Sequence, residues 1–162
     1  IINQYGTDAL RFCILSKSSN KDMKISENEF LDSSKFINKI WQSARFFDLQ
    51  IKKFNFGNNL LIDKEKFINN EINLLLDNFN NSMEKRDFLN ITRDIQHSFK
   101  HYFCDKWIEE NKSEIWKGNL DIIKEGLSIF YFYLNILHCF IPFITEYLSL
   151  HFFNIKLIDS SY

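Results

Sequence analysis

Apolar side chains recur at three- and four-residue intervals along most of the chain, and this is the spacing of one face of an α-helix. The first such segment predicts a helix over residues 7–16, with Thr7 as its N-cap. The residues expected to face inward are Leu10, Cys13 and Ile14. A polar turn over residues 17–24 ends this helix.

A second helix is predicted to begin at Ser26. Ser26 and Glu29 have the spacing of a capping box, in which each side chain can bond to the backbone amide of the other residue. The inward face of this helix is expected to comprise Phe30, Ile37, Ile40, Trp41, Ala44, Phe47 and Ile51. Gly57, Asn58 and Asn59 then break the chain.

The remaining apolar stripes predict three more helices. Asp63 is expected to cap the third helix, which ends at residues 80–82 and whose inward residues are Phe67, Ile72, Leu75, Leu76 and Phe79. The fourth ends near residues 117–119, and its aromatic stripe comprises Phe88, Ile91, Ile95, Phe99, Tyr102, Phe103 and Trp107. The fifth begins near Leu120, and Pro142 requires a kink or a new helix because it lacks an amide proton.

The composition supports the same fold class. With only 4 Gly and 1 Pro among 162 residues, the chain has few of the residues that the turns of sandwiches and barrels require. We therefore predict an all-α helical bundle of about five or six helices, in a single domain over residues 1–162. The most apolar run, residues 129–144, is shorter than the roughly 20 residues that cross a bilayer, so we expect it in the core and expect no membrane partner.

The cysteines bear on the cellular compartment of the protein, and the first residues bear on whether the chain is a fragment. Cys13, Cys104 and Cys139 are odd in number, lack CxxC spacing and have apolar neighbours, so we expect reduced thiols in a cytoplasmic protein. Residues 1–4 contain neither an initiator methionine nor the pattern of a secretory signal. We therefore expect this chain to be a fragment of a longer protein.

The face of the second helix opposite its apolar stripe carries a mixture of cations, amides and one ring. We call this set the polar strip: Lys35, Asn38, Lys39, Gln42, Arg45 and Phe46. Cations can neutralise phosphates, amides can read base edges, and an exposed ring can stack on a base, so the strip suits single-stranded RNA. In the alternative interpretation, Phe46 packs under the following loop and the cations merely solvate the helix.

Two further groups of residues could carry chemistry. His97 and His101 are four residues apart, with Cys104 or Asp105 close by, which is a possible metal clamp. The aromatic residues between them favour packing, and we predict no metal site. His138 and Cys139 are adjacent, so on a helix they point apart, and we predict no catalytic residue in this chain.

Four segments resemble motifs of class I aminoacyl-tRNA synthetases, in the order in which that family has them. Residues 5–12, YGTDALRF, resemble the helix that leaves the catalytic domain of these enzymes. Residues 36–46, FINKIWQSARF, are similar to the "NFxNKLWNAxRF" segment of valyl-tRNA synthetases. Residues 103–109, FCDKWIE, resemble the valyl "FCDWYLE" segment, and residues 137–146, LHCFIPFITE, resemble "LHPFMPFITEE".

The resemblance implies a role as well as a fold. It implies the anticodon-binding bundle of a valine–tRNA ligase, which receives the anticodon arm of valine tRNA. In that role the cations of the polar strip would meet phosphates, Asn38 and Gln42 would approach bases, and Phe46 would stack on an unpaired anticodon base.

The resemblance also implies what this chain lacks. The "HIGH" and "KMSKS" segments that bind ATP in the family are missing from this sequence. No cofactor is expected in this chain, whereas ATP and Mg would serve the parent enzyme. The catalytic domain of the same parent chain is the second expected partner.

Two alternatives stay open at this point. One is the anticodon-binding domain of an isoleucyl or leucyl synthetase. The other is a noncatalytic helical domain whose aromatic helices bind a protein partner. A "KMSKS" segment shortly before Ile1 in the parent chain would favour a ligase over the interaction domain.

Overall fold

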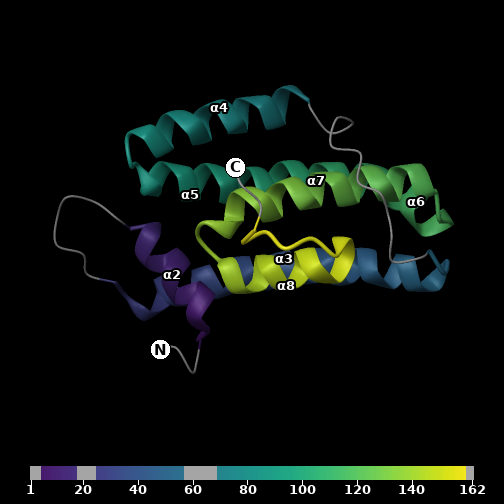
Figure 1. The fold of residues 1–162 in the computed structure, drawn as a ribbon, viewed down its shortest axis with the longest axis horizontal. Coiled ribbons are helices and arrows are strands. Elements are labelled where there is room, and N and C mark those ends of the chain that lie inside the picture. The colour runs from purple at the N-terminus through teal and green to yellow at the C-terminus, as the bar shows by residue number, and fades with distance from the viewer. Residues whose placement is uncertain (1–4, 18–24, 57–68, 160–162) are drawn as a thin grey trace.

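The computed structural model describes residues 5–17, 25–56 and 69–159 (Figure 1). The regular structure of these residues is entirely helical, which confirms the predicted all-α class. Its elements are α2 (Thr7–Leu15), α3 (Glu27–Lys53), α4 (Asn70–Glu84), α5 (Phe88–His97), η1 (Ser98–Ile108), α6 (Glu109–Lys117), α7 (Leu120–His138) and α8 (Pro142–Phe153). Because α5, η1 and α6 follow one another without a break, the described residues form six rods. None of the helices in these ranges is long and apolar enough to cross a membrane.

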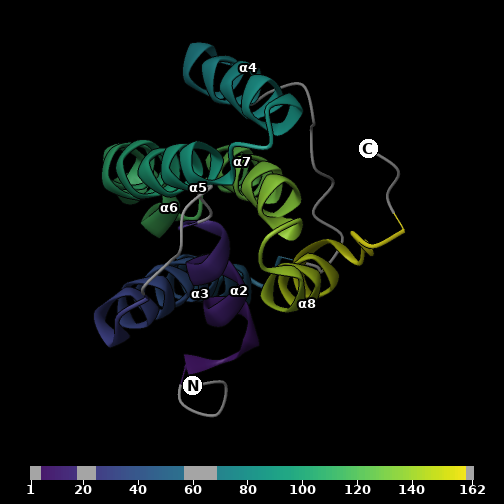
Figure 2. The same cartoon turned by 90° about the vertical axis from the view of Figure 1, so that its left-hand side faces the viewer.

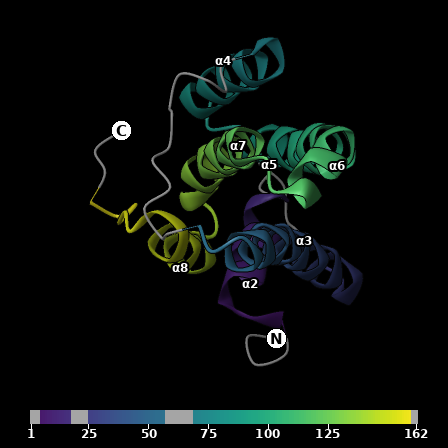
Figure 3. The same cartoon turned by 90° about the vertical axis from the view of Figure 1, so that its right-hand side faces the viewer.

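The rods lie in three layers. The middle layer contains α7 and the continuous rod of α5, η1 and α6, with α4 on one side and α3 and α8 on the other (Figures 1 and 2). The view from the opposite end has the same order (Figure 3). α2 packs against α3 and also contacts α5 and α8, so it joins two of the three layers.

Aromatic rings fill the core between the middle layer and α3. Phe47 of α3 stacks on Phe103 of η1 with ring centroids 6.2 Å apart, and Phe103 stacks on Phe130 of α7 at 6.0 Å. All three rings are fully buried. Gly126 of α7 is also part of this packing, because a Cβ at that position would lie 2.6 Å from the ring of Trp107. The aromatic stripe predicted for the fourth helix therefore lies in the centre of the core.

Local signals placed several helix ends correctly. The backbone amide of Ser26 donates to Glu29 Oε2 at 2.7 Å, and the predicted capping box forms. The rod of α5, η1 and α6 ends where Gly118 takes the left-handed φ of 81°. Pro142 is at the first position of α8, where the missing amide proton costs no helical hydrogen bond.

The N-terminal helix differs from the prediction in its cap and its inward face. Gly6, with φ 85°, is the N-cap, and Thr7 lies inside α2. Leu10 is half-buried and Ile14 is exposed. The buried residues of this helix are instead Asp8, Ala9, Phe12 and Cys13. On this buried side Phe12 packs against Phe36 of α3 at 5.0 Å, and the carboxylate of Asp8 accepts a hydrogen bond from Ile144 of α8.

The inward face of α3 is also rotated relative to the prediction. Phe36 is fully buried, because its ring packs against Phe12 at 5.0 Å and against Phe99 at 5.9 Å. Ile37 is consequently half-buried, and Trp41 lies at the edge of the face with 37% of its surface exposed. Ile37 still packs against the edge of the core, whereas the predicted inward position of Trp41 was wrong.

The helix after α3 ends later than predicted. It continues through residues 80–82 to Glu84, because Met83 still packs against the core. The turn that follows contains Arg86 at φ 55°, and Asp87 caps the next helix by accepting a hydrogen bond from the amide of Asn90. Asn69 caps the start of α4 by accepting from Ile72 at 3.0 Å. The predicted roles of Asp63 and Phe67 lie outside the described residues.

Candidate nucleic-acid interface

The polar strip lies along one exposed side of α3. Lys35, Asn38, Lys39, Gln42 and Arg45 are all exposed, and they extend over three turns of a single helix. The capping box at Ser26 and the buried aromatic face hold this helix in place, so the spacing between the five side chains is set by a rigid element. The structure therefore brings the polar members of the strip together.

Phe46 differs from the other members of the strip. Its side chain is half-buried and packs against the core, with its ring in an edge-on contact with Phe47 at 5.5 Å. The ring is thus not fully exposed, as the stacking interpretation assumed, nor is it fully buried. Only its outer part could meet a base.

Ion pairs occupy part of the strip. Lys39 Nζ lies 3.7 Å from Asp105 of η1, and Asp105 also contacts His101 at 3.2 Å. Lys35 pairs with Asp32 at 3.1 Å. These pairs are exposed, and exposed pairs contribute only about 0–1 kcal/mol, so a phosphate could replace the carboxylates at little cost. Arg45 has no ion-pair partner within residues 5–17, 25–56 and 69–159.

The considered metal clamp is not assembled. The rings of His97 and His101 are tilted by 52° with centroids 4.6 Å apart, but Cys104 turns inward and lies 3.4 Å from Ser43 Oγ. Burial raises the pKa of Cys104, which favours the neutral thiol over the thiolate that binds metals. In the part of the chain that the structure describes, no group of three or more His, Cys, Asp or Glu residues is placed to hold a metal ion.

His138 and Cys139 also point apart. His138 Nδ1 lies 2.9 Å from the hydroxyl of Thr145, which itself donates to the carbonyl of Ile141. Cys139 is exposed. This arrangement fixes the connection between α7 and α8 and does not pair a base with a nucleophile.

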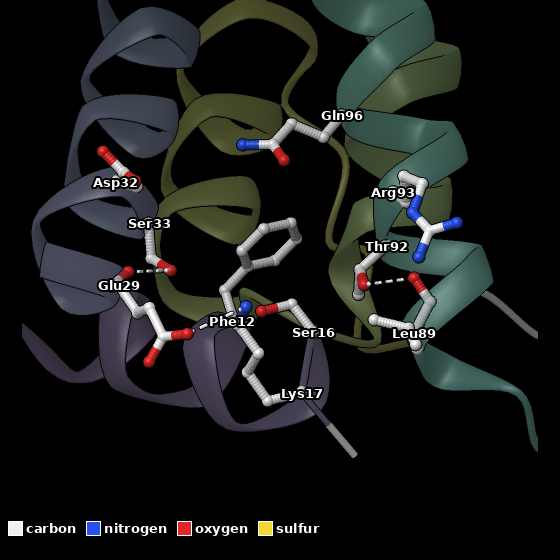
Figure 4. A pocket seen from close by; sticks show the side chains of 10 residues that line it. All are labelled: Phe12, Ser16, Lys17, Glu29, Asp32, Ser33, Leu89, Thr92, Arg93 and Gln96. Carbon is white, nitrogen blue, oxygen red and sulfur yellow. Dashed lines mark hydrogen bonds and ion pairs between the residues drawn. The ribbon is translucent and has the colours of Figure 1, made fainter. Parts of the chain in front are cut away.

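A polar hollow of about 270 Å³ lies between α2, α3 and α5 (Figure 4). Two of its charged groups pair with each other, since Lys17 meets Glu29 at 2.9 Å, and Asp32 pairs with Lys35 outside the lining. Ser33 donates to the carbonyl of Glu29, and Thr92 donates to the carbonyl of Phe88. Because the lining mixes opposite charges and most of them are already paired, we do not assign a ligand to it.

With this geometry in hand, comparison with known proteins defines the class. Residues 65–159 match the family model described as the anticodon-binding domain of tRNA ligase. This match covers more than half of the chain, and the chain belongs to that family. The predicted class I synthetase resemblance is confirmed.

Several relatives that the comparison found are valine–tRNA ligases. The chain is 32% identical over 152 residues to the valine–tRNA ligase of Borreliella burgdorferi, and 29% identical over 151 residues to that of Thermotoga maritima. It is 32% identical over 158 residues to the enzyme of Malacoplasma penetrans. Each alignment covers 90% of this chain but only 17% of the relative.

Proposed function

We propose that residues 1–162 form the anticodon-arm binding domain of a valine–tRNA ligase. The observation that carries the proposal is the exposed polar strip on α3, in a chain whose family is described as anticodon-binding. Relatives named as valine–tRNA ligases favour valine tRNA as the partner.

The residues of the strip have distinct roles in this proposal. Lys35, Lys39 and Arg45 meet phosphates of the anticodon arm, and the first two exchange their carboxylate partners for phosphate. Asn38 and Gln42 present amide donors and acceptors to unpaired bases. Because Phe46 is half-buried, it offers part of its ring to one base rather than a free platform.

The chemistry belongs to the parent enzyme. We propose that its catalytic domain, the second partner of this chain, uses ATP and Mg to attach valine to tRNA in the cytoplasm. The present chain contributes by holding the anticodon arm, so that the parent can select the correct tRNA.

The test is tRNA binding by strip variants of the full-length protein. Arg45→Ala and Lys39→Ala should each weaken the binding of valine tRNA and flatten the dependence of log affinity on log salt by up to about 0.7 for a contact to a single-stranded phosphate. Phe46→Ala should weaken binding by removing a stacking surface. Lys85→Ala, which removes an exposed cation outside α3, is the matched control.

Two outcomes would contradict the proposal. Unchanged affinity in all three strip variants would remove the strip from the interface. Equal binding of valine tRNA and isoleucine tRNA by the unaltered protein would leave the anticodon-binding role but remove the assignment to valine.

A further inference from the structure

A second exposed feature lies beside the polar strip, where α3 meets α8. Three rings form a row across this junction: Trp41 contacts Tyr147 with centroids 5.7 Å apart, and Tyr147 lies parallel to His151 at 6.3 Å. Trp41 comes from α3, whereas Tyr147 and His151 are one turn apart on α8. Tyr147 is 56% exposed, so packing against Trp41 uses only part of its ring.

The rings border a groove of about 180 Å³ between the two helices. Ala44, Leu148 and Phe152 contribute its apolar lining. Arg45 and Lys52 supply the cations of the lining. The groove therefore combines accessible aromatic surface with positive charge.

Among the described residues, one carboxylate lines this groove, and it is already paired. Asp48 accepts from Lys52 at 2.5 Å and lies 2.9 Å from His151 Nε2. Arg45 also lines the groove but has no ion-pair partner within the described residues. Its guanidinium is therefore the group best placed to receive an anion.

Aromatic faces next to an arginine are the combination that single-stranded nucleic acids use. Bases stack on exposed rings with little regard to sequence, and nearby cations neutralise the phosphates that join them. Arg45 belongs to the polar strip and to the groove, so the two surfaces are continuous. A strand lying along the strip would reach Tyr147 by crossing this one residue.

We propose that the α3–α8 groove holds an unpaired nucleotide of the anticodon loop, with its base on Tyr147 and Trp41 and its phosphate on Arg45. The inference rests on the proposed function and extends the RNA contact from one helix to two. Lys52 also lines the groove, but its charge is paired with Asp48, so Arg45 supplies the positive charge for the phosphate.

The test uses the full-length protein and an anticodon stem-loop RNA of valine tRNA. Tyr147→Ala should weaken binding roughly five- to hundredfold, the range expected for loss of one stacked base, whereas Tyr147→Phe should keep most of the affinity. Trp116→Ala is the matched control, because Trp116 is an exposed ring on α6 outside the groove. A stem-loop with 2-aminopurine at single loop positions should lose fluorescence on binding at one position, and Tyr147→Ala should restore it.

The outcomes separate this inference from the proposed function. If Arg45→Ala weakens RNA binding but Tyr147→Ala does not, the groove is excluded as a nucleotide site. The proposed role of the polar strip then remains. Equal losses in Tyr147→Ala and Trp116→Ala would also exclude the groove. If the unaltered protein self-associates, and Tyr147→Ala abolishes this while RNA binding stays unchanged, the groove binds a second copy of the chain and not RNA. Failure of the unaltered protein to bind the stem-loop would overturn both proposals.

Discussion

The carboxylate of Asp8 in α2 accepts a hydrogen bond of 2.8 Å from the backbone amide of Ile144 in the first turn of α8, although 136 positions separate the two residues. Its other oxygen accepts from Phe143 at 3.4 Å. The N-cap of α8, Ile141, has no side chain able to bond to these amides. A residue from the first described helix therefore caps the last one.

Replacing Asp8 should destabilise the fold through the loss of this cap. Asp8→Ala leaves two amides of α8 without their acceptor, and loss of a helix cap costs about 1–2 kcal/mol. Urea unfolding of the 162-residue chain, followed by circular dichroism, measures the change. Asp121→Ala is the control, since Asp121 is an exposed carboxylate in the first turn of α7. If Asp8→Ala loses no more stability than the control, water must satisfy the two amides in place of the carboxylate.

The pH dependence of stability should carry a signature of the same carboxylate. Burial raises the pKa of Asp8 above its ordinary value of 3.8, and this outweighs the amides of Ile144 and Phe143 and the charge of Arg11, which lower it. A carboxyl group with a raised pKa in the folded state contributes stability that is fully present below its unfolded pKa and is lost as the pH rises through its folded pKa.

Asp8→Asn isolates this effect, because asparagine does not titrate. The free energy of unfolding of the native chain, minus that of the variant, should fall as the pH rises above about 4 and then become constant. Chemical unfolding at a series of pH values measures it. A difference that instead rises with pH over this range would mean that the amides, and not burial, dominate the pKa of Asp8.

The packing of Gly126 against Trp107 predicts a cost for the smallest possible side chain. In Gly126→Ala the new Cβ would lie 2.6 Å from the Trp107 ring and 2.8 Å from Phe47. Overpacking of a core costs about 1–3 kcal/mol, which exceeds the gain of up to about 1 kcal/mol from the helix preference of alanine. Thermal unfolding should therefore show a lower midpoint. The cost should shrink in a Trp107→Phe background, and an unchanged cost there would rule out the Trp107 contact as its cause.

The ion pair between Lys39 and Asp105 predicts a variant with stronger RNA binding. If Lys39 meets phosphate as proposed, Asp105→Asn frees that cation and removes a negative charge near the strand. The affinity for the valine anticodon stem-loop should rise about two- to fivefold, as expected for an exposed pair. Asp121→Asn changes the net charge equally at a position outside α3 and η1, and it should have less effect in a filter-binding or anisotropy assay. Equal gains in affinity in both variants would mean that the change in net charge, and not the release of Lys39, causes the stronger binding.

Features encoded by neighbouring residues could be predicted from the sequence. Ser26, Gly118 and Pro142 act through their own backbone or a side chain three residues away, and each marks a helix end where expected. The exposed polar members of the strip followed from helical spacing in the same way. The π-helical geometry of η1 had no such signal, because its aromatic spacing is equally compatible with an α-helix.

Features set by pairs of distant helices were not predictable. Asp8 is buried where it bonds to the amides of α8, and Trp41 is 37% exposed at the junction of α3 and α8, where it contacts Tyr147. The α3–α8 groove was missed for the same reason. Trp41 was assigned to the apolar stripe, and the exposure of Tyr147 depends on which face α8 turns to its neighbours.

The contact between α2 and α8 also imposes an order on folding. Asp8 cannot find its native amide partners until the ribosome has made residues more than 130 positions further along, and Arg11, which donates to the carbonyl of Phe140, waits equally long. Contacts of such sequence separation carry a large loop-closure cost and form slowly. On a growing chain α2 can pack against α3 early. Its contacts with α8 can form only after α8 has been synthesised.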